Sequence, residues 1–116
     1  MKKTFSLKQN TNFRRAYYKG KRFSSPFIVL HVLNNKRCKM LDKNALGLTA
    51  STKIGKAVVR NRARRRMREA FAKYESSILP GHYIVLVARG DIVSADFSQL
   101  VRQLGGMLKK AGLFAD

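Results

Sequence analysis

The stretch KIGKAVVRNRARRRMREAF spans residues 53–71 and combines dense positive charge with regularly spaced apolar residues. Eight of the sixteen residues from Lys53 to Arg68 are lysine or arginine, and none is acidic. On a helical wheel of about 100° per residue the apolar residues share one arc of about 120°, the width of a core-facing stripe. The stretch therefore predicts a helix over about residues 57–74, anchored by Val59, Ala63, Met67, Ala70, Phe71 and Tyr74.

The outward surface of this predicted helix consists almost entirely of arginine. A solvated helix face normally mixes both signs of charge, because opposite charges four residues apart stabilise it. Here Glu69 is the only acidic residue up to Lys73. The planar fork of arginine suits phosphate oxygens, and Lys53, Lys56 and the free N–H groups near Ala57 add an anion site at the helix start. The surface predicts contact with nucleic acid.

Length and composition indicate one folded domain, residues 1–116, with a polyanionic partner. The net charge is +19, from 25 basic and 6 acidic residues, while 45% of the chain is apolar. Self-repulsion on this scale opposes compaction, so nucleic acid is the first candidate partner and an anionic membrane the second. Cys38 is the only cysteine, which excludes an internal disulfide and a zinc site built from cysteine pairs and favours a reducing, cytoplasmic location.

The flanking segments predict a small sheet packed by helices. We expect, in chain order, a helix over about residues 10–19, a strand over 27–33, a loop over 34–44, a strand over 45–51, the basic helix, a strand over 82–90 and a last helix capped by Ser94 and ended by Gly112. In the second strand Leu46, Leu48 and Ala50 face one way, so that strand has one buried and one open face. The order αββαβα indicates the α/β (α+β) class.

A second group of candidate residues is aromatic. Phe13 and Tyr17 lie four residues apart on the first helix, and the period of two places Phe27 and His31 on one face of the first strand. An open sheet face with aromatic residues and basic rims is typical of proteins that hold single-stranded nucleic acid. Packing of the first helix against the sheet explains the spacing of Phe13 and Tyr17 equally well.

The sequence shows no catalytic or metal-binding constellation. The chain has two histidines, whose spacing does not pair them, and no glycine-rich phosphate loop. Its six carboxylates belong to separate predicted elements, whereas a magnesium site in a protein needs clustered carboxylates. We therefore expect the protein alone to bind no catalytic metal ion and to cleave no RNA.

The stretch GLTASTKIGKAVVRNRARRRMREAF resembles the signature of the bacterial ribonuclease P protein subunit, with Arg60-Asn61-Arg62 as its core. The segments LKQNTNFRRAYYKG and YIVLVARG match the family in order. The resemblance implies three helices on a mostly four-stranded sheet with a left-handed βαβ crossover, a fold shared with the second domain of a small-subunit ribosomal protein. It also implies a monomeric protein that assists a catalytic RNA in removing the 5′ leader of precursor tRNA, with magnesium held mainly by the RNA and substrate.

The resemblance also implies roles for individual residues. Those expected to face the catalytic RNA are Lys53, Lys56, Arg60, Asn61, Arg62, Arg64, Arg65 and Arg68. A cleft between the first helix and the sheet is expected to hold the single-stranded leader, with Phe13, Tyr17, Phe27, His31 and Arg89 as its residues. Some relatives carry an aromatic residue at the position of His31, which weakens the expectation of stacking there.

Three other classes of protein compete with this interpretation. A ribosomal or other structured-RNA-binding protein would have the same charge but no preference for single-stranded leaders. A helix-turn-helix DNA-binding protein would not place strands on both sides of its basic helix. A membrane-active basic protein would need a broader apolar face than this helix offers.

Overall fold

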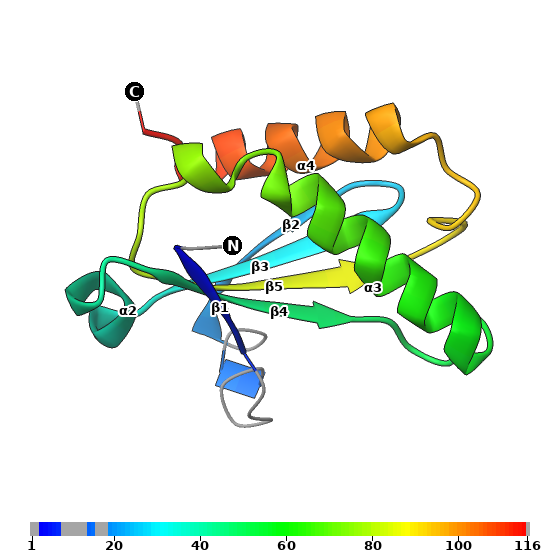
Figure 1. Cartoon of the computed structure of the whole chain (residues 1–116), viewed down its shortest axis with the longest axis horizontal. Helices are drawn as coiled ribbons and strands as arrows, with labels where there is room; N and C mark the ends of the chain where they lie inside the picture. Colours follow the sequence, from blue (N-terminus) through cyan, green and yellow to red (C-terminus); the bar gives the residue numbers. More distant parts are fainter. Residues whose placement is uncertain (1–2, 8–13, 16–18, 116) are drawn as a thin grey trace.

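The computed structural model describes residues 3–7, 14–15 and 19–115, and its centre is a mixed five-stranded sheet (Figure 1). The strands lie in the order β1-β4-β5-β3-β2. Neighbours β1, β4 and β5 run parallel, whereas β3 runs antiparallel to both β5 and β2. In chain order the strands are β1 (Thr4–Ser6), β2 (Lys21–Ser24), β3 (Ile28–Asn34), β4 (Asn44–Thr49) and β5 (His82–Ala88).

Two long helices cover the same face of this sheet (Figure 1). They are α3 (Ala57–Ala72) and α4 (Phe97–Lys110); the short α2 (Lys36–Met40) joins β3 to β4, and a 3-10 turn, η1 (Glu75–Ser77), follows α3. Helix α3 connects the neighbouring parallel strands β4 and β5. This βαβ unit is the crossover that the resemblance implies. The left-handedness of the crossover stays a prediction.

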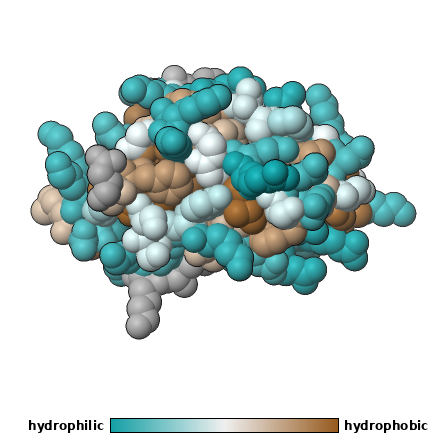
Figure 2. Space-filling view, turned by 90° about the horizontal axis from the view of Figure 1, so that it is seen from above, coloured by the Kyte–Doolittle hydropathy of each residue, from teal (hydrophilic) through white to brown (hydrophobic). Residues whose placement is uncertain are grey.

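The main hydrophobic core lies between the sheet and the two long helices. Alternate residues of β3 and β5 point into it, and burying each such side chain stabilises the fold by about 1.5–3 kcal/mol. The stripe predicted for the basic helix is confirmed, because its central residues are fully buried there. Fully buried members of this core include Ile28, Leu30, Ile84, Leu86, Ala63, Met67, Ala70, Phe71, Leu100, Leu104 and Leu108. Seen from the α4 side, hydrophilic side chains surround the apolar ones of this layer (Figure 2).

A smaller apolar cluster lies on the opposite face of the sheet. It contains Leu7, Ala45, Tyr83 and Val85, together with Cys38 from α2. Burial raises the pKa of the Cys38 thiol, and this effect outweighs a hydrogen bond with the Ala45 backbone that acts to lower it. Cys38 is therefore a neutral packing residue at neutral pH rather than a reactive thiolate.

The structure corrects the expected number of strands and the expected loop over residues 34–44. The edge strands β1 and β2 hold three and four residues, too few to produce a readable alternation. Helix α2 occupies the middle of the expected loop, because Asn35 caps it by accepting a hydrogen bond from the Cys38 N–H at 2.9 Å.

The ends of the last helix are partly as predicted. Asp96, rather than Ser94, is the N-cap of α4, and its side chain accepts a hydrogen bond from the Ser98 N–H. Gly112 follows the last residues of α4 with a φ of 73°, a left-handed conformation that ends a helix and favours glycine, so this stop is confirmed. The expected first helix, over about residues 10–19, lies mostly outside the described residues. Within this range only residues 14, 15 and 19 are described, and all three are helical.

Candidate RNA interface

Helix α3 turns its apolar stripe toward the core and its arginines outward, as the helical wheel predicts. Met67 and Phe71 are fully buried, whereas Arg62, Arg65 and Arg68 are exposed. We name the outward surface the arginine face, consisting of Asn61, Arg62, Arg64, Arg65 and Arg68.

The arginine face and Val58 line a shallow hollow of about 510 Å³, and none of the described residues that line it is acidic. Nη1 of Arg64 donates a hydrogen bond to Oδ1 of Asn61 at 2.8 Å. The asparagine thus orients one guanidinium and keeps its own amide N–H groups for a ligand. Val58 is 71% exposed and offers an apolar contact inside a charged surface, a feature that no sequence pattern indicates.

The approach to α3 carries the two predicted lysines. Lys53 and Lys56 are both exposed, and Lys56 is the N-cap residue but provides no side-chain hydrogen bond. The first N–H groups of the helix therefore stay open to an anion. Arg60, in the first turn, is half-buried, and its Nε has no hydrogen-bond partner among the described residues.

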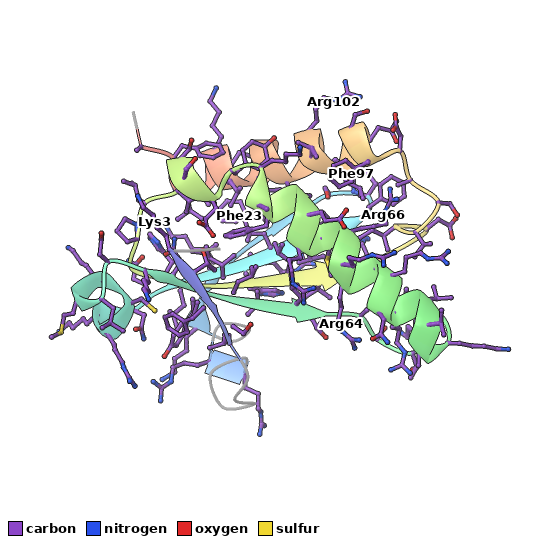
Figure 3. The ribbon with its side chains drawn as sticks, viewed as in Figure 1. Lys3, Phe23, Arg64, Arg66, Phe97 and Arg102 are labelled. Carbon is purple, nitrogen blue, oxygen red and sulfur yellow. The ribbon has the colours of Figure 1, made fainter. Side chains whose placement is uncertain are left out.

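Arg66 differs from the other arginines of α3 because it is already engaged within the protein. Its Nη2 donates a hydrogen bond to the backbone oxygen of Ala95, and its guanidinium lies 5.9 Å from the centre of the Phe97 ring. Figure 3 shows Arg66 and Phe97 side by side. In the same view Arg64 extends from α3 away from this pair, and Arg102 points away from α4. Arg66 was not among the residues expected to face RNA, and these contacts attach α3 to the start of α4.

His31 lies on the sheet face opposite α3 and α4. In the strand register it stands between Arg22 of β2 and Val85 of β5, and only 4% of its surface is exposed. Burial lowers the pKa of His31, and the nearby charge of Arg22 lowers it further. His31 is therefore neutral at pH 7. Arg22 next to it was not predicted, because β2 is too short to be recognised.

The structure separates the other residues predicted for the leader cleft. Phe27 precedes β3 and packs against the core on the α3 and α4 side, so the expectation that it shares a face with His31 is wrong. Its N–H donates to the side chain of Gln103 on α4 at 3.3 Å. Arg89 follows β5, is exposed, and donates its N–H to the Phe27 oxygen at 3.0 Å. The predicted residues Phe13 and Tyr17 lie outside the described residues.

The described residues offer neither a cluster of metal ligands nor a helix that spans a membrane. Among them, no three histidine, cysteine, aspartate or glutamate side chains come together as a group that could hold a metal ion. No helix in the described part of the chain is long and apolar enough to cross a membrane.

Comparisons with known proteins agree with the architecture and the basic helix. The family model described as Ribonuclease P matches residues 1–112. The ribonuclease P protein component of Caldanaerobacter subterraneus subsp. tengcongensis is 39% identical over 98% of this chain and 95% of that protein, and that of Clostridioides difficile is 33% identical over 96% and 95%. The Staphylococcus aureus RNase P protein superposes with a TM-score of 0.82 at 33% identity over 96% of this chain and 98% of that one.

The structure of the Thermotoga maritima RNase P protein gives a TM-score of 0.77 at 27% identity, covering 90% of this chain and 96% of that one. Family model, relatives and solved structures thus agree over almost the whole chain. The chain belongs to the bacterial ribonuclease P protein family and is a protein component of ribonuclease P, the endoribonuclease that matures the 5′ end of tRNA.

Proposed function

We propose that the arginine face and its approach lysines form the surface that binds the catalytic RNA of ribonuclease P. The observation that carries this proposal is a hollow whose described lining holds four arginines and an asparagine but no acidic residue. It lies on a helix that is fixed by a stripe fully buried at its centre. Arginine forks bind phosphate oxygens in pairs. A rigid helix holds them in a fixed arrangement, so the unbound protein is already organised for a folded RNA.

The protein assists catalysis and does not perform it. Removal of a leader needs metal ions near the attacking and leaving oxygens, and the described carboxylates do not gather into a group that fits magnesium. Magnesium is held mainly by the phosphates of the RNA subunit and the substrate. The positive charge of the protein strengthens the binding of the substrate to that complex.

The sheet face around His31 binds the single-stranded leader of precursor tRNA. The exposed Arg22, next to the buried and neutral His31, places a positive charge on this face, which suits a phosphate of the leader. Phe13 and Tyr17 supply the aromatic surfaces. Arg89 contacts the leader at the far end of β5, where the backbone of Phe27 holds it.

The first experiment measures binding of the catalytic RNA by fluorescence anisotropy. Replacing both Arg62 and Arg65 by alanine should weaken binding at least tenfold and make it less sensitive to salt. The slope of log affinity against log salt should fall by about 0.7–0.9 for each phosphate that the variant no longer neutralises. Arg102→Ala is the control, because Arg102 belongs to α4 and is not part of the arginine face on α3. Its side chain points away from α4 (Figure 3). Equal effects of the arginine-face pair and the control would refute the proposed surface.

The second experiment separates leader binding from RNA binding. Phe13→Ala and Tyr17→Ala should weaken the affinity of the assembled complex for precursor tRNA with a long leader, since stacking is worth about 1–3 kcal/mol per base. A precursor with a one-nucleotide leader cannot reach the cleft and should bind unchanged. Equal losses on both substrates would mean that the two residues only pack the first helix.

A further inference from the structure

A second basic surface lies at the end of the molecule opposite the start of α3. In Figure 1, α2 and the first turn of α3 lie near the two ends of the longest axis of the molecule. This axis measures 37 Å. At the α2 end β3 ends at Asn34 and β5 begins at His82. Neither the arginine face nor the leader cleft includes any residue of this end.

Two hollows meet at this end of the sheet. One, of about 420 Å³, is lined by Lys36, Lys39, Pro80 and Gly81 with Asn34, Asn35 and His82. The other, of about 360 Å³, is lined by Lys19, Lys21 and the residues after α4, again with Asn34 and His82. Because two residues are common to both, the hollows are neighbours. We name them together the lysine groove, defined by Lys19, Lys21, Lys36, Lys39, Asn34 and His82.

The charge of the lysine groove is not neutralised from within. All four of its lysines are exposed, and no acidic residue in the described part of the chain lines either hollow. Two separate chain segments, residues 19–21 and 36–39, bring these like charges to one place, at an electrostatic cost. Charge complementarity identifies the occupant as a polyanion.

The floor of the lysine groove is fixed by hydrogen bonds. Asn35 donates its N–H to the Gly81 oxygen at 2.8 Å. The buried Asn44 accepts from the His82 N–H and donates to the Leu79 oxygen, each at 3.0 Å. Gly81 has a φ of 102°, and a Cβ on it would lie 3.1 Å from the Cβ of Lys39. A glycine is therefore needed to let α2 approach this turn.

The histidine presents a defined edge to a ligand. Nδ1 of His82 lies 3.2 Å from the Leu79 oxygen and 3.3 Å from Oδ1 of Asn44. Both partners are acceptors, so Nδ1 carries the proton. Nε2 is then the ring nitrogen left for a ligand, and a bound anion would favour its protonation.

We propose that the lysine groove binds the phosphodiester backbone of an RNA strand, as a second contact within the complex of this protein with the catalytic RNA and precursor tRNA. This inference rests on the proposed function. Lysines act as point charges without the fork of arginine, so this contact recognises backbone charge rather than sequence. The strand comes either from the catalytic RNA or from the distal part of a long leader. A membrane is the rival occupant, because Met40 and Leu41 at the end of α2 are exposed.

The test compares three variants that each lose two positive charges. Two alter the lysine groove, K36Q/K39Q and K19Q/K21Q, and the matched control is K73Q/R102Q, at exposed positions outside the groove. Binding to the catalytic RNA alone is measured over a range of salt, and binding of the assembled complex is measured with short-leader and long-leader precursors. Thermal unfolding checks that each variant remains folded.

Each groove variant should lower the affinity for one of these RNAs about tenfold and reduce its salt slope by about 1.4, two phosphates at about 0.7 each for a single strand. The control should change affinity less than twofold. A loss of affinity for catalytic RNA alone identifies that RNA as the occupant, and a loss confined to long-leader precursor identifies the leader.

Groove variants that behave like the control on every RNA, while the unmodified protein binds normally, would overturn this inference and leave the proposed function standing. An unmodified protein that fails to bind the catalytic RNA would overturn both. The membrane alternative is tested by sedimentation with phosphatidylglycerol vesicles. Vesicle binding that the groove variants abolish, with RNA binding unchanged, would also overturn the inference.

Discussion

At the scale of single residues, Gly105 shows how a residue that weakens a helix alone can stabilise the folded protein. Glycine inside a helix costs about 0.8–1 kcal/mol relative to alanine. Here the hydroxyl of Tyr74 fills the space beside Gly105 and donates a hydrogen bond to the Val101 oxygen at 2.7 Å. Tyr74 also lies against Phe114, with ring centres 5.5 Å apart. The glycine thus lets Tyr74, which follows α3, pack on α4.

Gly105→Ala should therefore destabilise the protein, by about 1–3 kcal/mol as for other overpacked sites. The new Cβ would lie 2.4 Å from the Tyr74 hydroxyl oxygen. Gly106 is the matched control: it is the next residue of α4, and a Cβ there meets nothing within 4 Å, so Gly106→Ala should stabilise by up to about 1 kcal/mol. Urea unfolding measures both, and a stabilised Gly105→Ala variant would contradict the packing described.

The buried His31 predicts a dependence of stability on pH. Its folded-state pKa is lowered by burial and then by Arg22. Its contribution to stability is therefore fully present above the ordinary histidine pKa of about 6.5 and is lost as the pH falls through the folded-state pKa. When the pH is lowered from 7.5 to 5, the unfolding free energy of the His31→Phe variant should fall by less than that of the unmodified protein. Equal losses, measured by urea unfolding at each pH, would mean that His31 is solvated.

At the scale of elements, α3 is the best predicted part of the molecule. Its stripe repeats over four turns, and this long pattern fixes both the type of element and the face that is buried. The short β1, β2 and α2 could not be predicted, because three to five residues carry no period. In addition, β4, the pairing partner of β1, is distant from it in sequence. The placement of Arg22 beside His31 was missed for the same reason.

The two kinds of arginine on α3 should separate experimentally. Arg66→Ala removes the interactions with Ala95 and Phe97, and it should cost about 1–3 kcal/mol of unfolding free energy, because a charged hydrogen bond disappears and its acceptor is left unpaired. Arg65→Ala, at an exposed position, should change stability by about 0.5 kcal/mol or less yet weaken RNA binding. Similar unfolding curves for the two variants would contradict the role assigned to Arg66.

At the scale of the whole molecule, the net charge of +19 is distributed over distinct surfaces. Composition alone predicts a polyanionic partner, and the helical wheel locates the arginine face. The lysine groove could not be predicted, since its lysines come from two segments that only the sheet brings together. The interface between Phe27 and α4 was likewise hidden, because strand alternation does not extend to a residue that precedes the strand.

We propose that this chain assists a catalytic RNA and does not cleave RNA itself. The decisive experiment compares cleavage of precursor tRNA at low magnesium by the ribonuclease P RNA alone, by the purified protein alone, and by both together. We expect accurate removal of the leader only by the mixture, and no cleavage by the protein at any magnesium concentration. Accurate 5′ maturation by the protein alone, after nuclease treatment to remove contaminating RNA, would contradict the claim.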